Sequence, residues 1–128
     1  MLIKQLSVFV ENKTGRLSAI VDELAKANID ISALSMADTT DFGVLRLIVS
    51  DTDKAKAVLR EAGVAVKSSD VLAVEMEDKP GAFAGQLAKL SENGVAVEYM
   101  YAFTARKEGH AMMVLRVDDP AKAEELIG

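Results

Sequence analysis

The stretch Leu6-Ser7-Val8-Phe9-Val10-Glu11-Asn12-Lys13-Thr14-Gly15 decides the fold, because its pattern recurs at Leu72-Ala73-Val74-Glu75-Met76-Glu77-Asp78-Lys79-Pro80-Gly81. Few residues are identical, but apolar residues alternate along both copies, as they do in a half-buried strand. In each copy the alternation ends at a polar turn that closes with a glycine. A pattern that repeats in this way indicates two copies of one structural unit.

Both copies predict the same order of elements: strand, helix, strand, strand, helix. The first copy predicts strands over 3–10, 29–37, 43–50 and 64–67, and helices over 16–27 and 52–62. The second predicts strands over 71–76, 95–104 and 110–117, and helices over 82–93 and 120–127. A polar link, 67–70, is expected between the copies. Beyond residue 40 the alignment shifts, which places a two-residue insertion between Thr104 and His110.

This order predicts an α+β fold of two ferredoxin-like βαββαβ repeats side by side, each an antiparallel sheet with its helices on one face. We expect the repeats to span 1–69 and 70–128. The second repeat ends at its second helix and lacks its last strand, so the edge beside 71–76 is expected to be open.

The sheet face opposite the helices is also expected to be apolar. Its members are expected to be Phe9, Val44, Ile48, Met112 and Val114. A face of this kind is rarely left in water as one patch. Together with the open edge, it predicts a homodimer, or a strand donated between the copies.

Composition excludes several classes of protein. A formal net charge of −5 opposes nucleic-acid binding, and no apolar run approaches the roughly 18 residues of a membrane span. The first residues alternate like a strand rather than like a signal peptide, so we expect a cytoplasmic protein. The chain has no cysteine and one histidine, His110, which excludes disulfides and sites that need two imidazoles.

No catalytic constellation stands out. His110 follows Glu108-Gly109 at the expected mouth of a hairpin, where we expect an exposed residue without a catalytic role. The acidic residues are scattered and show no metal-ligand spacing. We therefore expect no enzyme, no metal and no cofactor.

The two glycine-containing loops carry the most chemical information. A helix N-terminus has unpaired N–H groups and a partial positive charge, which attract a carboxylate or a phosphate. The adjacent Asn12 or Asp78 side chain is able to accept hydrogen bonds from an ammonium group. Together these groups suit a free amino acid. A second interpretation stays open, in which Gly15 and Gly81 serve only a tight strand-to-helix turn.

The segments Glu11–Leu17 and Glu77–Phe83, each followed by a helix, resemble the ACT domain. Its usual pattern is Asp-(Lys/Arg)-Pro-Gly-x-Leu, a helix, and then Ile-Asn-Ile, which Ile29-Asp30-Ile31 and Val95-Ala96-Val97 follow in part. The segment 37–49 is similar to a hairpin of small stand-alone proteins with two ACT domains. The resemblance covers nearly the whole chain.

The resemblance implies an amino-acid site between two ACT domains. It is formed by the first loop of one domain and by the start of the second strand from the same domain or a neighbour. Carried over, the ligand-binding residues are Asn12, Gly15, Arg16, Leu17 and Asp30 in the first repeat, and Asp78, Gly81, Ala82 and Phe83 in the second. Thr14 replaces the usual proline, Asp30 is a carboxylate where an amide is common, and Ala96 has no polar side chain. We therefore expect the second site to be weaker or unused.

The resemblance implies a small allosteric regulatory protein that senses a free amino acid. An alternative is a non-catalytic regulatory subunit that binds and controls an amino-acid-biosynthesis enzyme, an arrangement similar to that of the regulatory subunit of acetohydroxyacid synthase. A third, a small enzyme of ferredoxin-like fold, is disfavoured by the missing catalytic constellation.

Overall fold

The computed structural model describes residues 1–38, 41–105 and 108–128. Contacts divide the chain into two compact units. We call Lys4–Ser69 the first unit, and Asp70–Gly128 together with Met1–Ile3 the second unit. The residues between the expected strands 29–37 and 43–50, and the expected insertion between Thr104 and His110, fall partly outside the described ranges.

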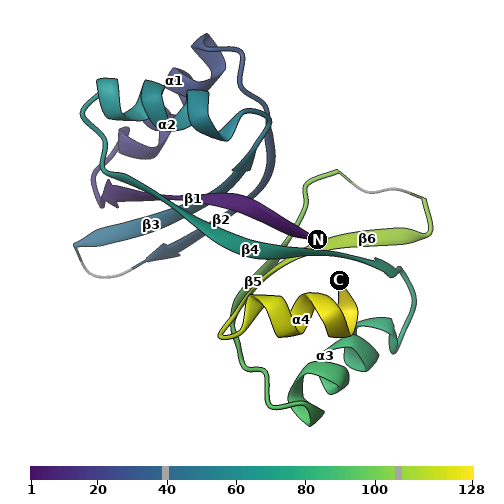
Figure 1. Ribbon diagram of the computed structural model, residues 1–128. Coiled ribbons are helices and arrows are strands. Elements are labelled where there is room, and N and C mark those ends of the chain that lie inside the picture. The colour runs from purple at the N-terminus through teal and green to yellow at the C-terminus, as the bar shows by residue number, and fades with distance from the viewer. Residues whose placement is uncertain (39–40, 106–107) are drawn as a thin grey trace. The chain divides into compact units, whose positions relative to one another are not determined.

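The elements follow the predicted order (Figure 1). The strands are β1 (Leu2–Glu11), β2 (Ile31–Asp38), β3 (Phe42–Val49), β4 (Val66–Glu77), β5 (Val97–Ala102) and β6 (His110–Val117). The helices are α1 (Arg16–Lys26), α2 (Thr52–Glu61), α3 (Ala82–Glu92) and α4 (Pro120–Ile127).

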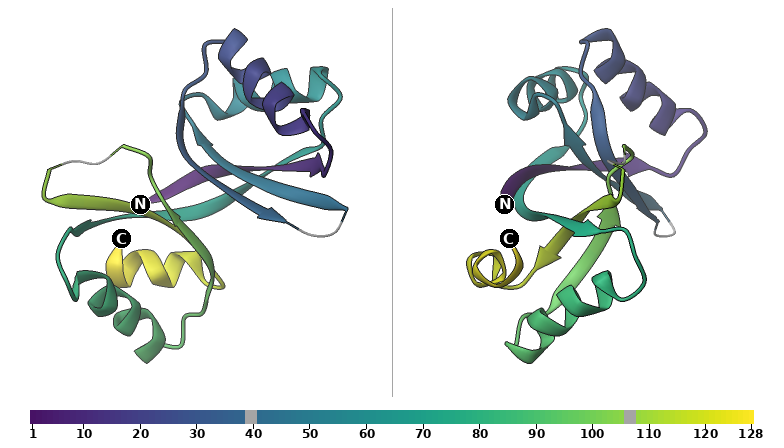
Figure 2. Two further views of the ribbon diagram at one scale, coloured as in Figure 1. Left: turned by 180° about the vertical axis from the view of Figure 1, so that it is seen from behind. Right: turned by 90° about the vertical axis from the view of Figure 1, so that its right-hand side faces the viewer.

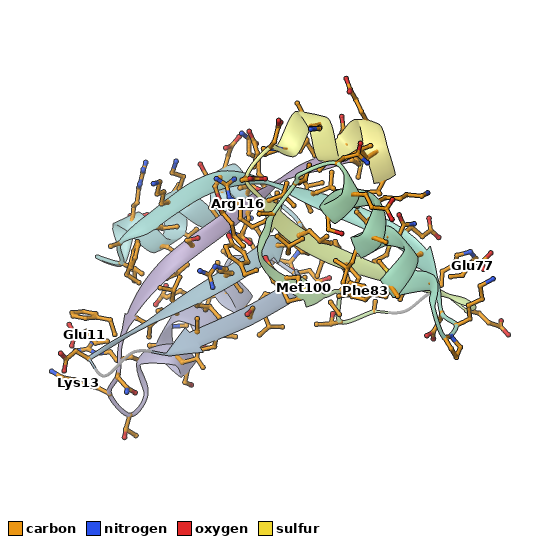
Figure 3. The ribbon with its side chains drawn as sticks, turned by 90° about the horizontal axis from the view of Figure 1, so that it is seen from below. Glu11, Lys13, Glu77, Phe83, Met100 and Arg116 are labelled. Carbon is orange, nitrogen blue, oxygen red and sulfur yellow. The ribbon has the colours of Figure 1, made fainter. Side chains whose placement is uncertain are left out.

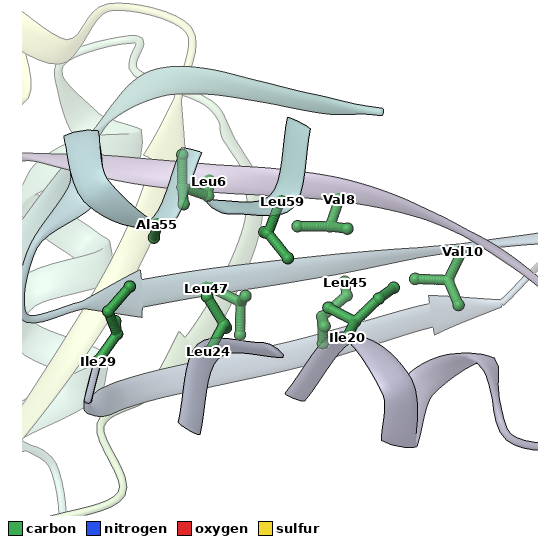
Figure 4. Close-up of a cluster of buried hydrophobic side chains, with 10 residues drawn as sticks. All are labelled: Leu6, Val8, Val10, Ile20, Leu24, Ile29, Leu45, Leu47, Ala55 and Leu59. Carbon is green, nitrogen blue, oxygen red and sulfur yellow. The ribbon is translucent and has the colours of Figure 1, made fainter. Parts of the chain in front are cut away.

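In the first unit, β3 lies between β2 and β1 and is antiparallel to both. Leu6 is paired with Leu47 and Val8 with Leu45, so the alternating apolar residues of neighbouring strands share a face. Both helices lie on that face (Figures 1 and 2). Figure 4 shows the resulting core. Its members are Leu6, Val8, Val10, Ile20, Leu24, Ile29, Leu45, Leu47, Ala55 and Leu59.

The second unit repeats this arrangement. Strand β6 lies between β4 and β5 and is antiparallel to both, and α3 and α4 pack together on one face. The buried core there consists of Leu72, Val74, Met76, Leu90, Val95, Leu115, Val117 and Ala123. The predicted ferredoxin-like repeats, antiparallel with their helices on one face, are confirmed.

The polar link expected at 67–70 is wrong, because β4 runs without interruption from Val66 to Glu77. The serines of this segment fit a strand because their surroundings supply polar partners. The Lys56 ammonium donates to Ser68 Oγ over 3.4 Å, and the Arg116 guanidinium donates to the Asp70 carbonyl over 2.6 Å. A polar stretch with such partners is stable as a strand, although its composition is typical of a loop.

The N-terminus occupies part of the edge that the sequence left open. The Ala73 N–H donates to the Met1 carbonyl over 2.8 Å, and the Met1 ammonium donates to the Ala73 carbonyl over 3.1 Å. The Leu2 N–H also donates to Glu124 Oε2 over 2.7 Å. Residues 1–3 therefore act as an edge strand of the second unit.

The strand pairing brings expected members of the apolar face opposite the helices next to one another. Phe9 pairs with Val44, and Val114 pairs with Ala73, each outside the helix-covered core. Its members differ in burial: Ile48 and Val114 are buried, whereas the Phe9 side chain is 48% exposed. The whole face is therefore not open to water.

Both second helices of the repeats begin at an aspartate cap. Asp51 Oδ1 accepts from the Lys54 N–H over 3.1 Å, and Asp119 Oδ1 accepts from the Lys122 N–H over 3.2 Å. Replacing Asp51 with alanine is expected to lower the free energy of unfolding by about 1 kcal/mol, because the cap is lost. Chemical denaturation measures the loss, and Asp51→Asn, which keeps a cap acceptor, should recover most of it. An equal loss in both variants would contradict the capping role.

Candidate functional site at the first loop of each unit

The two glycine-containing loops have the same backbone structure. In the first unit, the Asn12 N–H donates to the Asp41 carbonyl over 3.1 Å, and the Arg16 N–H donates to the Lys13 carbonyl over 3.2 Å. In the second, the corresponding Asp78 N–H donates to the Gly109 carbonyl over 2.9 Å, and the Ala82 N–H donates to the Lys79 carbonyl over 3.3 Å. The first helical N–H of each helix is therefore already used within its turn.

Gly15 and Gly81 are the N-cap residues of α1 and α3, and both have a left-handed backbone, with φ of 85° and 87°. Glycine adopts this conformation without strain, whereas other residues rarely do. An added Cβ would meet no atom within 4 Å at either position. The turn itself therefore requires glycine, and the space beside each glycine is open to a ligand.

Each loop also holds an exposed ion pair. Glu11 Oε2 lies 3.3 Å from Lys13 Nζ and 4.0 Å from the Arg16 guanidinium, and Glu77 Oε2 lies 2.6 Å from Lys79 Nζ. Figure 3 shows Glu11 and Lys13 together at the end of β1. The Lys79 hydrogen bond and charge hold the pKa of Glu77 below its usual value, with a smaller contribution from His110. Both lysines thus have a carboxylate partner inside the loop.

Cavities adjoin both loops, but the cavities differ in character. A cavity of about 280 Å³ at the first loop is lined by Glu11, Asn12, Lys13, Asp41 and Phe42. A larger one of about 380 Å³ in the same unit is mostly apolar and includes Arg16. In the second unit, Gly81 and Ala82 line a polar cavity of about 600 Å³. Of the predicted ligand-binding residues, Arg16, Gly81 and Ala82 line the two larger cavities, and Asn12 lines the small one.

Sequence reasoning missed most of the polar residues around the 600 Å³ cavity. They are Glu75, Glu77, Lys79, Gln86, Lys89 and His110. The internal repeat relates some of these residues to a cavity of the first unit. Lys89 aligns with Glu23 and His110 with Phe42, and both Glu23 and Phe42 line the cavity of about 380 Å³. His110 is half-buried beside this cavity, and the expectation that it is simply exposed is wrong.

Asp30 does not lie at the first loop of its own unit. Its carbonyl accepts from the Ser50 N–H, and its own N–H donates to Ser50 Oγ, both over 3.0 Å. Ser50 follows the end of β3, whereas Phe42 at the start of β3 pairs with Glu11 beside the loop. At about 3.3 Å per residue, the length of β3 separates the two ends by roughly 25 Å. One ligand cannot contact both ends within one unit.

Ala96 occupies the matching place in the second unit. Its N–H donates to Asp118 Oδ1 over 3.0 Å, and its carbonyl accepts from the Asp118 N–H over 3.1 Å. The backbone at this position is therefore held from the facing strand in both units. These hydrogen bonds use only the backbone of residues 30 and 96, so neither side chain is needed for them. The Asp30 side chain is exposed.

The first residues of α1 and α3 differ in exposure. Leu17 is 41% exposed, whereas its counterpart Phe83 packs on the core of the second unit together with Met100 (Figure 3). Leu34 and Met36 on β2 are each 44% exposed. The first unit thus has exposed apolar side chains on β2 and at the start of α1.

Two kinds of feature are absent from the described residues. No helix among them is long and apolar enough to cross a membrane. Within residues 1–38, 41–105 and 108–128, no group of three or more histidine, cysteine, aspartate or glutamate side chains is placed to hold a metal ion.

Comparison with known proteins identifies the family. The family model described as an ACT domain pair matches residues 1–128, so the chain belongs to the ACT domain pair family. Protein BT0572 from Bacteroides thetaiotaomicron is 44% identical, with a TM-score of 0.92, over 98% of this chain and 86% of that one. A search of curated proteins found no match.

More distant structures share the fold. The ligand-free regulatory subunit of aspartate kinase from Thermus thermophilus is 14% identical, with a TM-score of 0.69, over 99% of this chain and 91% of that one. A structure of aspartokinase alpha and beta subunits is 18% identical, with a TM-score of 0.57, over 98% of this chain and 93% of that one. The resemblance to tandem ACT domains seen in the sequence is confirmed.

Proposed function

We propose that the protein is a cytoplasmic, non-enzymatic regulatory protein that senses a free amino acid at the first loop of its first unit. The observation that carries this proposal is the match to an ACT domain pair over residues 1–128. The loop geometry supports it, because Asn12 lines a cavity beside a helix N-terminus whose glycine leaves open space.

Asp30 lies too far from the first loop of its own copy to contact a ligand there. In this proposal, the Asp30 side chain that contacts the ligand therefore belongs to a second copy of the chain. Strand β2 is at an edge of the first unit and carries the exposed Leu34 and Met36, and Leu17 at the start of α1 is exposed as well. Two such edges that pair antiparallel about a two-fold axis would cover these side chains. The same pairing would place the start of one β2, with Asp30, at the loop end of the other copy.

The proposed ligand contacts follow from this arrangement. The carboxylate of the amino acid lies at the N-terminus of α1, near Gly15, Arg16 and Leu17. Its ammonium group is held by Asn12 and by Asp30 of the second copy. In the second unit, Asp78, Gly81, Ala82 and Phe83 form the weaker counterpart, because Ala96 supplies no polar side chain.

The dimer has a direct test. Leu34→Asp combined with Met36→Asp is expected to give a monomer, because two carboxylates would be buried at the proposed contact. Light scattering measures the mass of the particle. Phe9→Asp is the matched control, since Phe9 is similarly exposed at 48% but lies away from the β2 edge. A dimer that survives the double substitution, or a wild-type monomer, would refute this contact.

The ligand is tested by calorimetric titration of the wild-type protein with each of the twenty amino acids. We expect binding of one amino acid or of a few related ones. A regulatory subunit that acts without a ligand is the alternative function, favoured by the exposed apolar residues of the β2 edge. Absence of heat with every amino acid would support that alternative against sensing.

A further inference from the structure

A mostly apolar cavity of the first unit continues from the first loop. It has a volume of about 380 Å³ and lies between the end of β1, the start of α1 and residues 62–65, which follow α2. The smaller cavity that Asn12 lines shares Glu11 and Phe42 with it. Glu11 and Phe42 are paired across β1 and β3, so the two cavities meet at this pair. A molecule held at Asn12 is therefore able to extend into the larger cavity.

The walls of the 380 Å³ cavity are apolar and are held in place by the fold. The apolar lining includes Phe9, Ala19, Ile20, Phe42, Val64 and Ala65. The Val64 N–H donates to the Leu59 carbonyl over 2.9 Å, which holds residues 62–65 to the end of α2. The Phe9 N–H donates to the Ala65 carbonyl over 3.1 Å, which fixes the same residues beside β1. The cavity is thus preformed, and its volume and lining are typical of sites for small apolar groups.

Two aromatic residues of this lining are more exposed than the other aromatic residues of the chain. Phe9 is 48% exposed and Phe42 is 54% exposed, whereas the four other aromatic side chains are buried or half-buried. Exposed aromatic side chains lack the stabilisation that burial gives, and a bound apolar group supplies part of it. Because both residues line the cavity, their exposure points to an apolar occupant.

The acidic residues of the lining already have partners of opposite charge. Glu11 Oε2 lies 3.3 Å from Lys13 Nζ. Glu23 Oε1 lies 3.8 Å from Lys26 Nζ. The Arg16 guanidinium lies 4.0 Å from Glu11 Oε2, too far for a hydrogen bond, so Arg16 is able to donate to a ligand carboxylate. A charged ligand side chain would enter an apolar cavity without a partner of its own, which is costly.

We propose that the amino acid sensed at the first loop has a large apolar side chain, and that this side chain occupies the 380 Å³ cavity. The inference rests on the proposed function of the first loop. The carboxylate lies at the start of α1 beside Arg16, and the ammonium group lies at Asn12. The side chain passes the Glu11–Phe42 pair and packs against the apolar walls. Leucine, isoleucine, methionine and phenylalanine belong to this class, whereas alanine leaves the cavity empty and lysine or glutamate brings a charge into it.

The first experiment is a calorimetric titration of the wild-type protein with each of the twenty amino acids. We expect at least one of the four large apolar amino acids to bind at least tenfold more tightly than alanine, because each buried methylene adds roughly fourfold in affinity. Lysine and glutamate should bind no more tightly than alanine. Tightest binding by a small, polar or charged amino acid would overturn the apolar class and leave amino-acid sensing intact. Heat with none of the twenty would overturn both.

A second experiment tests which cavity the side chain occupies. Ala19→Leu fills part of the 380 Å³ cavity and is expected to weaken binding of the preferred apolar amino acid at least tenfold. Ala25→Leu is the matched control, since both alanines are exposed on α1 but Ala25 does not line the cavity. The control variant should bind as the wild type does. Equal affinities of the two variants would overturn the assignment of this cavity.

A third measurement uses the wild-type chain and so does not depend on how either variant folds. Nuclear Overhauser contacts between the preferred amino acid and the isotopically labelled protein should join the ligand side chain to the methyl groups of Ala19, Ile20 and Val64. Contacts with Leu34 and Met36 in their place would overturn the proposal, because they would put the side chain at the β2 edge instead.

Discussion

Replacing Leu24 with alanine is expected to lower the free energy of unfolding by about 2–5 kcal/mol. Leu24 is fully buried where α1 packs on the strands of the first unit (Figure 4). Truncation removes apolar contact and leaves a cavity that rigid strands on one side and α2 on the other cannot easily close. Denaturation in urea measures the loss for the variant and the wild type.

The matched control for Leu24 is Phe9→Ala, which removes more atoms from a side chain that is 48% exposed. It should cost less than about 1 kcal/mol, because exposed side chains gain little from folding. Leu90, the counterpart of Leu24 in the second unit, is 1% exposed and should behave like Leu24 when truncated. Similar losses for Phe9→Ala and Leu24→Ala would contradict the assignment of the core face.

The second large effect is expected on ligand binding. Asn12→Ala and Asp30→Ala should each weaken binding of the amino acid identified by titration about tenfold to a hundredfold, because each removes a hydrogen bond to the ammonium group. Calorimetry measures the affinity. The melting temperature should barely change, because both side chains are exposed and the Asp30 backbone is latched to Ser50.

The control for these variants is Asp22→Ala, which removes an exposed carboxylate of the same unit that pairs with Lys26 instead. It should bind the ligand as the wild type does. If Asn12→Ala and Asp30→Ala also bind like the wild type, the ligand site lies elsewhere in the chain.

The sequence predicted the fold well because its signals are local and occur twice. Alternating strands such as Leu6–Val10 and helical faces such as that of Leu24 reflect the periods of their elements directly. The caps Asp51 and Asp119 marked the starts of two helices, and both have the hydrogen bonds that a cap requires. Because both copies have the same order of elements, the sequence predicted the ferredoxin-like arrangement for each.

What the sequence did not reveal depends on partners far along the chain. The polar residues at 67–70 looked like a link, because nothing local shows that Lys56 and Arg116 supply their hydrogen bonds. The pairing of Met1 with Ala73 joins residues 72 positions apart. Such contacts arise from topology and leave no local pattern.

The candidate site shows the same division. The left-handed conformations of Gly15 and Gly81 agree with the loop motif. The distance between Asp30 and the first loop became clear only from the register of β3, because Phe42 lies at its start and Ser50 follows its end. Because Asp30 lies far from the first loop of its own copy, the proposed ligand site uses Asp30 of a second copy.

The most direct test of a site shared between two copies is a mixing experiment with Asn12→Ala and Asp30→Ala. Each variant alone should bind the amino acid weakly, because every site in its dimer lacks one partner. In a mixed dimer, one site regains both wild-type side chains and the other loses both. After equal amounts exchange subunits, calorimetry should therefore recover wild-type affinity at about a quarter of the wild-type number of sites. A mixture that binds no better than its separate components would contradict the shared site.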